Sequence, residues 1–108
     1  MPSAEEVNAS NFEVERVLVE KETFSMVWGV FDDRTEKKRC VGVRWNGQDG
    51  SLGFPSDSVR ALWFVMPKTL SLALLPRIIK VRHAQEKAIE HALRDLRTLP
   101  EPGVIDWE

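Results

Sequence analysis

Three glycines recur at every third position in the stretch RWNGQDGSLGFP, which runs from Arg44 to Pro55. Clustered glycines either let the backbone approach a phosphate group closely or turn the chain. A phosphate loop needs a lysine and a hydroxyl residue after its last glycine, and a dinucleotide fold needs the spacing Gly-x-Gly-x-x-Gly. Gly47, Gly50 and Gly53 show neither pattern. We therefore predict a turn of about eight residues joining two strands, and the alternative is a loop that contacts a ligand or partner at the sheet edge.

Residues that could act as nucleophiles or metal ligands are few, and their spacing does not match that of known catalytic or metal sites. His83 and His91 lie eight residues apart on a predicted helix, whereas metal-binding pairs on a helix favour spacings of three or four. Cys40 is the single cysteine, and among apolar neighbours it is predicted to be a small core side chain. Asp32 and Asp33 are adjacent, so in an extended chain they point to opposite sides and cannot serve one cleft. We expect no catalytic, metal or cofactor site.

Tryptophan is the most unusual feature of the composition, with four residues in the chain and no tyrosine. Aromatic side chains on a sheet beside Arg39 and Arg44 could stack on the bases of single-stranded nucleic acid. They could equally fill the core or contact another protein. The signature of an RNA-recognition sheet is absent from KRCVGVRW. The candidate partner-binding residues are Trp28, Arg44, Trp45, Trp63 and Trp107.

Length and composition indicate one soluble domain. The chain has 108 residues, of which 43% are hydrophobic and 30% charged, as in ordinary globular domains. It contains no apolar run long enough to span a membrane and no signal-peptide pattern at its start. With a lone cysteine as well, we expect a cytoplasmic protein.

Charge is distributed unevenly along the chain. Residues 1–22 hold six acidic and two basic residues, residues 77–97 hold six basic and three acidic ones, and residues 100–108 hold three acidic and none basic. The formal net charge is −2, which argues against nucleic acid as the main partner.

Short β-branched and aromatic runs fill the first part of the chain. Residues 23–31 and 38–45 are predicted strands joined by the polar loop 32–38, the dipeptide Asn46-Gly47 is typical of a tight hairpin turn, and residues 61–66 are a further strand. Residues 12–21 are ambiguous, because Ser10 and Glu13 resemble a helix capping box while the apolar residues resemble a strand with a bulge.

The second part of the chain changes to a helical period. Residues 68–75 predict a short helix that Pro76 ends or kinks. A long helix then carries an apolar stripe at three- and four-residue steps from Ile78 to Leu99. We predict an α+β fold in which an antiparallel sheet of three to four strands is followed by a short and a long helix packed on one face. The domain spans residues 11–99, between a tail of residues 1–10 and an acidic tail of residues 100–108.

Strand faces suggest how such a protein acts. Residues 23–31 and 61–66 are apolar on both sides, yet helices that all follow the strands should cover one side only. The side that the helices leave free is predicted to be an uncovered aromatic face, and such faces mark interaction sites. We therefore predict a non-catalytic domain that binds itself as a homodimer or binds another protein. The alternatives are a nucleic-acid-binding accessory protein with an Arg/Trp sheet surface and a small-ligand binder with a pocket between sheet and helix.

Overall fold

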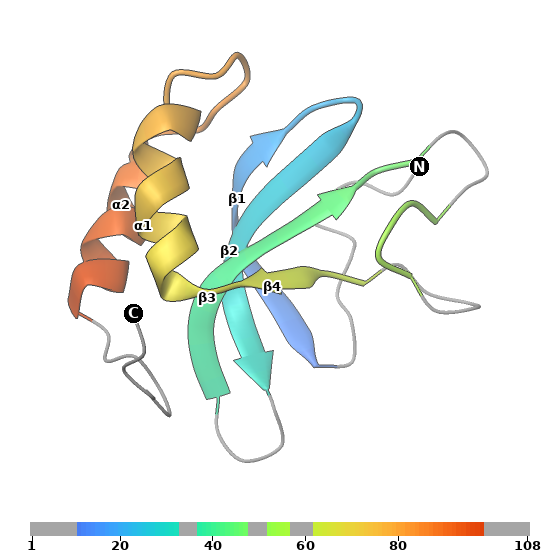
Figure 1. The fold of residues 1–108 in the computed structure, drawn as a ribbon, viewed down its shortest axis with the longest axis horizontal. Coiled ribbons are helices and arrows are strands. Elements are labelled where there is room, and N and C mark those ends of the chain that lie inside the picture. Colours follow the sequence, from blue (N-terminus) through green and yellow to red (C-terminus); the bar gives the residue numbers. More distant parts are fainter. Residues whose placement is uncertain (1–10, 33–36, 48–51, 57–61, 99–108) are drawn as a thin grey trace.

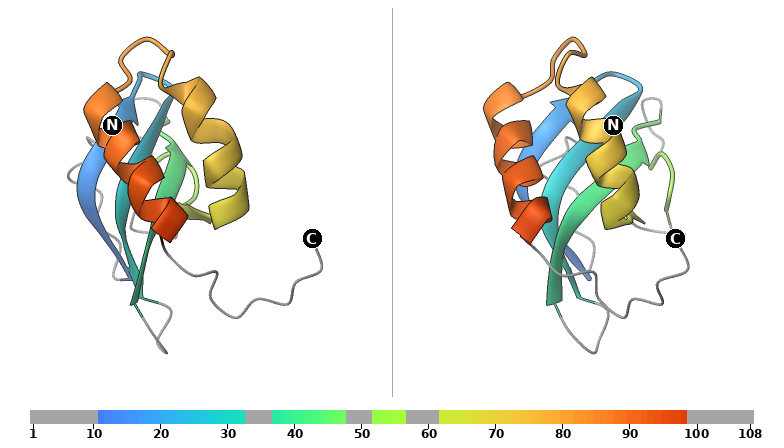
Figure 2. Two further views of the ribbon diagram at one scale, coloured as in Figure 1. Left: turned by 90° about the vertical axis from the view of Figure 1, so that its left-hand side faces the viewer. Right: turned by 60° about the vertical axis from the view of Figure 1, so that its left-hand side comes forward.

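The computed structural model describes residues 11–32, 37–47, 52–56 and 62–98. Four strands form one antiparallel sheet in chain order, and two helices follow them (Figure 1). Both helices lie on the same face of the sheet (Figure 2). The predicted α+β arrangement is confirmed. Its elements are β1 (Phe12–Glu20), β2 (Phe24–Asp32), β3 (Lys37–Trp45), β4 (Phe64–Met66), α1 (Lys68–Ile78) and α2 (Glu86–Thr98).

The ambiguous segment near the start of the chain is a strand. β1 pairs with β2, and the register shifts between Val14 and Arg16 and again between Val17 and Val19. Such irregularities bend a strand and increase its twist. The capping-box pattern does not lead to a helix, because pairing with β2 provides partners for the backbone N–H and C=O groups of β1.

The helix boundary predicted at Pro76 is wrong. α1 continues through Pro76 to Ile78. A proline in the last turn of a helix removes only one amide donor, and the hydrogen bond that closes the helix, from Ile79 N–H to the Leu75 carbonyl, is kept at 3.1 Å. The long helix begins only at Glu86. Between the helices His83 has φ 72°, a left-handed conformation that no α-helix can contain.

The connection between the helices is attached to the outer edge of β1. Ala84 forms an isolated bridge with Val19, and Gln85 N–H donates to the Leu18 carbonyl at 2.7 Å. These contacts give β1 a partner on the side away from β2 and leave β4 as the outer strand at the opposite edge.

The main core lies between the sheet and the helices. Trp28 is fully buried at its centre, with Val41 from β3 and Leu75 from α1. α2 contributes the buried stripe that its periodicity predicts, namely Ile89, Ala92, Leu93 and Leu96. Within the described ranges, no helix is long and apolar enough to cross a membrane.

A second, smaller core closes the other face of the sheet, which corrects the prediction that this face is uncovered. Phe12, Val27 and Trp63 are buried there, and the Phe12 and Trp63 rings lie 6.0 Å apart between centroids. The bend in β1 brings Phe12 across β2, and Gly29 leaves the space that the ring occupies. Phe12 of the first strand therefore covers part of the face that the helices leave free.

Candidate interaction surface

The candidate residues separate into interior and surface positions. Trp28 is 0% exposed, Arg44 2% and Trp63 8%, whereas Trp45 is 62% exposed. Trp107 lies outside the described residues. Of the four candidates that the structure describes, only Trp45 presents its ring to solvent.

Arg44 holds a loop of its own chain. Its Nη1 donates to the Leu62 carbonyl at 2.9 Å and its Nη2 donates to the Leu52 carbonyl. The guanidinium carbon lies 5.8 Å from the centroid of the Trp63 ring, within the range of a cation–π contact. Burial lowers the pKa of Arg44. The guanidinium thus ties two segments of the chain to the far face of the sheet.

The glycine stretch is closed by backbone pairing. Trp45 and Phe54 exchange two hydrogen bonds, of 2.7 Å from Trp45 N–H and 2.9 Å from Phe54 N–H, so eight residues, 46–53, separate the paired positions. Gly53 has φ 74° and packs against the Trp45 carbonyl and Arg44, a conformation that glycine alone adopts easily. The ends of the stretch are therefore paired, as a turn requires, but Phe54 belongs to an isolated bridge and not to a second strand, which differs from the predicted turn between two strands. Residues 48–51 lie outside the described residues.

Asn46 does not form a tight two-residue turn, as the dipeptide Asn46-Gly47 had suggested. Its N–H donates to the Thr23 carbonyl at 2.8 Å, its Nδ2 donates to the Lys21 carbonyl at 2.6 Å, and its Oδ1 accepts from the Ser25 hydroxyl at 2.9 Å. The buried amide is used to join the end of β3 to the connection between β1 and β2.

The exposed large apolar side chains gather at the β4 edge of the molecule. They are between 40% and 68% exposed and form what we term the apolar edge surface: Trp45, Phe54, Phe64, Leu70 and Leu74. Phe64 pairs with Val43 and Phe54 pairs with Trp45. Because paired residues share a face and Val43 and Trp45 are two apart on one strand, the three aromatic side chains stand in neighbouring positions on the helix-bearing side.

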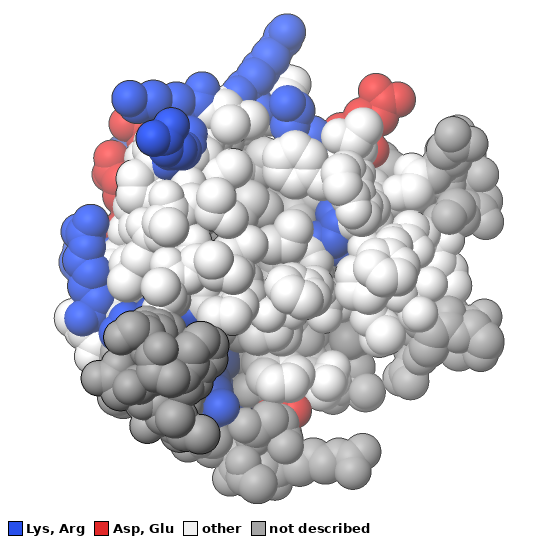
Figure 3. Space-filling view, in the orientation of Figure 1, with Lys and Arg blue, Asp and Glu red and all other residues white. Residues whose placement is uncertain are grey.

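α1 extends this surface. Leu70, Leu74 and Arg77 recur at the i, i+4 and i+7 spacing that places them on one flank of a helix. Leu72 and Ile79 pack into the main core from the opposite flank, next to α2. The exposed leucines therefore lie on the flank of α1 that faces away from the main core. Figure 3 shows a broad uncharged area over α1, β4 and the end of β3, bordered on the α1 side mainly by lysine and arginine.

The extent of the apolar edge surface is comparable to that of the largest apolar patch on a typical monomer. An aromatic side chain has about 150–250 Å² of surface to bury, so the exposed fractions of the five side chains amount to about 500 Å². The largest apolar patch of a typical monomer is about 300–600 Å² and is often functional. Sequence reasoning had placed Phe64 on an apolar strand face and the two leucines in a short apolar helix. Trp45 is the one member that the sequence had marked as a candidate; no sequence signal singled out the other four, because their exposure depends on tertiary packing.

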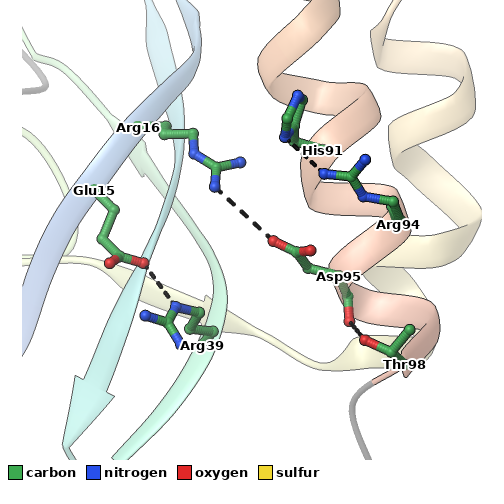
Figure 4. A network of polar contacts seen from close by, with 7 residues as sticks. All are labelled: Glu15, Arg16, Arg39, His91, Arg94, Asp95 and Thr98. Atoms are coloured by element: carbon green, nitrogen blue, oxygen red, sulfur yellow. Dashed lines mark hydrogen bonds and ion pairs between the residues drawn. The ribbon is translucent and has the colours of Figure 1, made fainter.

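Two arginines of the sheet form ion pairs with carboxylates of the same chain. Arg39 Nε donates to Glu15 Oε1 at 3.0 Å, and this bond raises the pKa of Arg39. Arg16 lies 3.9 Å from Asp95 of α2 (Figure 4). Because Arg39 pairs with Glu15 and Arg44 is buried, the Arg/Trp platform for nucleic acid loses both of its cations.

A polar concavity lies between β1 and the start of α2. It encloses about 950 Å³ and is lined by Val17, Glu20, His83, Gln85, Glu86, Lys87, Ala88 and Glu90. Three of these eight side chains are carboxylates. The described residues contain no group of three or more histidine, cysteine, aspartate or glutamate side chains placed to hold a metal ion.

Nucleophilic chemistry has little support at Cys40. Burial raises the pKa of its thiol to about 12, which keeps it protonated, whereas a thiolate is the reactive form. His83 was predicted to lie on the long helix but belongs to the connection before it. His91 Nδ1 lies 3.0 Å from Arg94 Nη2 on the exposed side of α2. The structure brings neither histidine to the cysteine.

Comparison of the chain with protein-family models, curated proteins and solved structures finds no match.

Proposed function

We propose that this chain is a non-catalytic protein-interaction domain that self-associates, most simply as a homodimer, through the apolar edge surface. The observation that carries the proposal is the exposure of five large apolar side chains on adjacent elements. Removing such side chains from water is the main driving force of protein association.

The area of the surface supports a specific interface. Stable complexes bury about 800 Å² on each partner, and the five apolar side chains supply more than half of that area. The polar rim of an interface commonly contributes the remainder. Two-fold pairing of identical chains is the commonest form of assembly.

Mass measurement by sedimentation equilibrium or light scattering tests the proposal directly. The mass of the wild-type chain should rise to that of a dimer as its concentration approaches about 100 µM, where a complex of micromolar affinity is almost fully formed. Phe64→Ser should weaken the dimer by about tenfold or more, the effect of truncating one central apolar side chain. Arg82→Ser, on the exposed connection between the helices, is the matched control and should leave the mass unchanged.

Two outcomes would refute the proposal. A wild-type chain that stays monomeric throughout this concentration range does not self-associate. A dimer that Phe64→Ser leaves intact uses a different surface.

A further inference from the structure

The charges beside the apolar edge surface define the chemistry of what binds there. α1 carries Lys68 and Arg77 and no acidic residue, and Arg77 shares the flank of Leu70 and Leu74. Two such flanks placed face to face would bring basic side chains of both copies together, which is unfavourable. The surface therefore suits an apolar segment that also carries carboxylates.

The chain contains one segment of this kind outside the described residues. Residues 103–108 read Gly-Val-Ile-Asp-Trp-Glu, in which Val104, Ile105 and Trp107 are interleaved with two acidic residues. No lysine or arginine occurs in residues 99–108. Residues 1–10 are also acidic, but Val7 is their only branched aliphatic residue and they contain no aromatic one. We propose that residues 103–108 of a second copy occupy the apolar edge surface, so that the dimer forms by reciprocal exchange of this segment.

Reach permits such an exchange. α1 and α2 run side by side in opposite directions (Figures 1 and 2), so the end of α2 lies at the same end of the helix pair as the start of α1. The five residues 99–103 can span about 17 Å when extended, more than the ~10 Å diameter of a helix. Pro100 and Pro102 favour an extended backbone over a chain reversal, which favours the surface of a second copy over that of the same chain.

The inference depends on the self-association proposed above, and one set of full-length variants separates the two. The double variant Ile105→Ala, Trp107→Ala should weaken the dimer by about tenfold or more, as Phe64→Ser does. The two cores that the structure describes are built from residues 12–96, so we expect the far-ultraviolet circular dichroism and the melting temperature to be unchanged. Val7→Ala, which removes an apolar side chain from the other terminal segment, is the matched control and should leave the dimer intact.

Mixing gives the decisive result. The Phe64→Ser chain keeps an intact segment and the Ile105→Ala, Trp107→Ala chain keeps an intact surface. A mixture of the two weakened variants should therefore form a heterodimer with one working contact, more stable than either variant's homodimer. Added salt should weaken this heterodimer, because charge pairs contribute to it.

The outcomes are distinguishable. A dimer that Ile105→Ala, Trp107→Ala leaves at wild-type strength, or variants that do not complement each other, would overturn the exchange while self-association stands. A monomeric wild-type chain would overturn both the exchange and the self-association. This includes a monomer in which the segment binds the surface of its own chain, which would show as protection of the amides of Leu70 and Leu74 from hydrogen exchange.

Discussion

Replacing Gly29 with alanine tests how closely β1 packs on β2. Gly29 pairs with Val14, and a Cβ at this position would lie 2.6 Å from Phe12 Cε1 and closer still to the carbonyl oxygen of Glu13. Ordinary contacts between carbon atoms are about 3.5–4.0 Å, so β1 would have to move by about 1 Å. Because the nearest atom belongs to the backbone, no change of rotamer relieves the contact.

We expect Gly29→Ala to lower the free energy of unfolding by about 3 kcal/mol. Displacing β1 loosens about two ladder hydrogen bonds worth about 1 kcal/mol each, and the overpacking itself costs about 1–3 kcal/mol. The lower entropy of alanine in the unfolded chain offsets about 0.5–1 kcal/mol of this loss.

Gly42→Ala is the matched control on the neighbouring strand. Its Cβ would lie 3.0 Å from Phe12 Cζ and 3.3 Å from Trp63 Cε3, both side-chain atoms that can shift by a few tenths of an ångström. The strain and the entropic gain nearly cancel, so its stability should stay within about 1 kcal/mol of wild type.

Urea denaturation followed by circular dichroism measures both effects, since midpoints at equal slope report stability. In thermal melts the Gly29→Ala chain should lose about 10–20 °C. Equal midpoints for the two glycine variants would refute the reasoning. In a Phe12→Ala background the loss from Gly29→Ala should shrink, and strict additivity would show that the ring is not an obstacle.

Four further outcomes are expected. Ile89→Asp should unfold the domain, because an unpaired buried carboxylate costs several kcal/mol and the free energy of unfolding of a domain is only about 5–15 kcal/mol. Glu90→Ala should leave the melting temperature nearly unchanged. Equal melting temperatures for the two variants would contradict the buried stripe of α2. The pKa of Cys40 is raised to about 12 from an ordinary 9.0, which predicts slow reaction with thiol reagents until the chain unfolds. The same shift contributes to stability in full below pH 9, and this contribution is lost as pH rises through 12. A reaction rate of the native chain equal to that of the unfolded chain would contradict the burial of the thiol. Arg44→Met should cost about 1–3 kcal/mol in urea melts by leaving two loop carbonyls without their donor, and unchanged stability would show that the loop does not need the guanidinium. Isothermal titration with ATP, GTP and NAD should detect no binding, whereas saturable micromolar binding that Gly50→Ala abolishes would mean that the glycine stretch cradles phosphate.

Local pattern predicted most of the strands and the buried side of α2. β-Branched and aromatic runs identified β2 and β3 to within a residue at each end, because both strands are apolar over most of their length and are bounded by polar connections. The boundary between the helices was missed, since a proline near the end of a helix removes only one bond and the apolar period continued across the connection. His83 shows no sequence signal for its left-handed conformation, which accompanies the pairing of the adjacent Ala84 with β1.

Residue type and spacing determined that this chain forms strands followed by helices, that α2 buries the stripe containing Ile89, and that the glycine stretch is closed by a turn. Tertiary structure alone decided which apolar side chains remain in contact with water. Trp28, Trp45 and Trp63 are equivalent by type and by local pattern, yet one fills the main core, one lies beneath Arg44 and one is exposed. The physical reason is that burial depends on what packs across each face. Phe12 of β1 covers Trp63, the helices cover Trp28, and no described element covers Trp45.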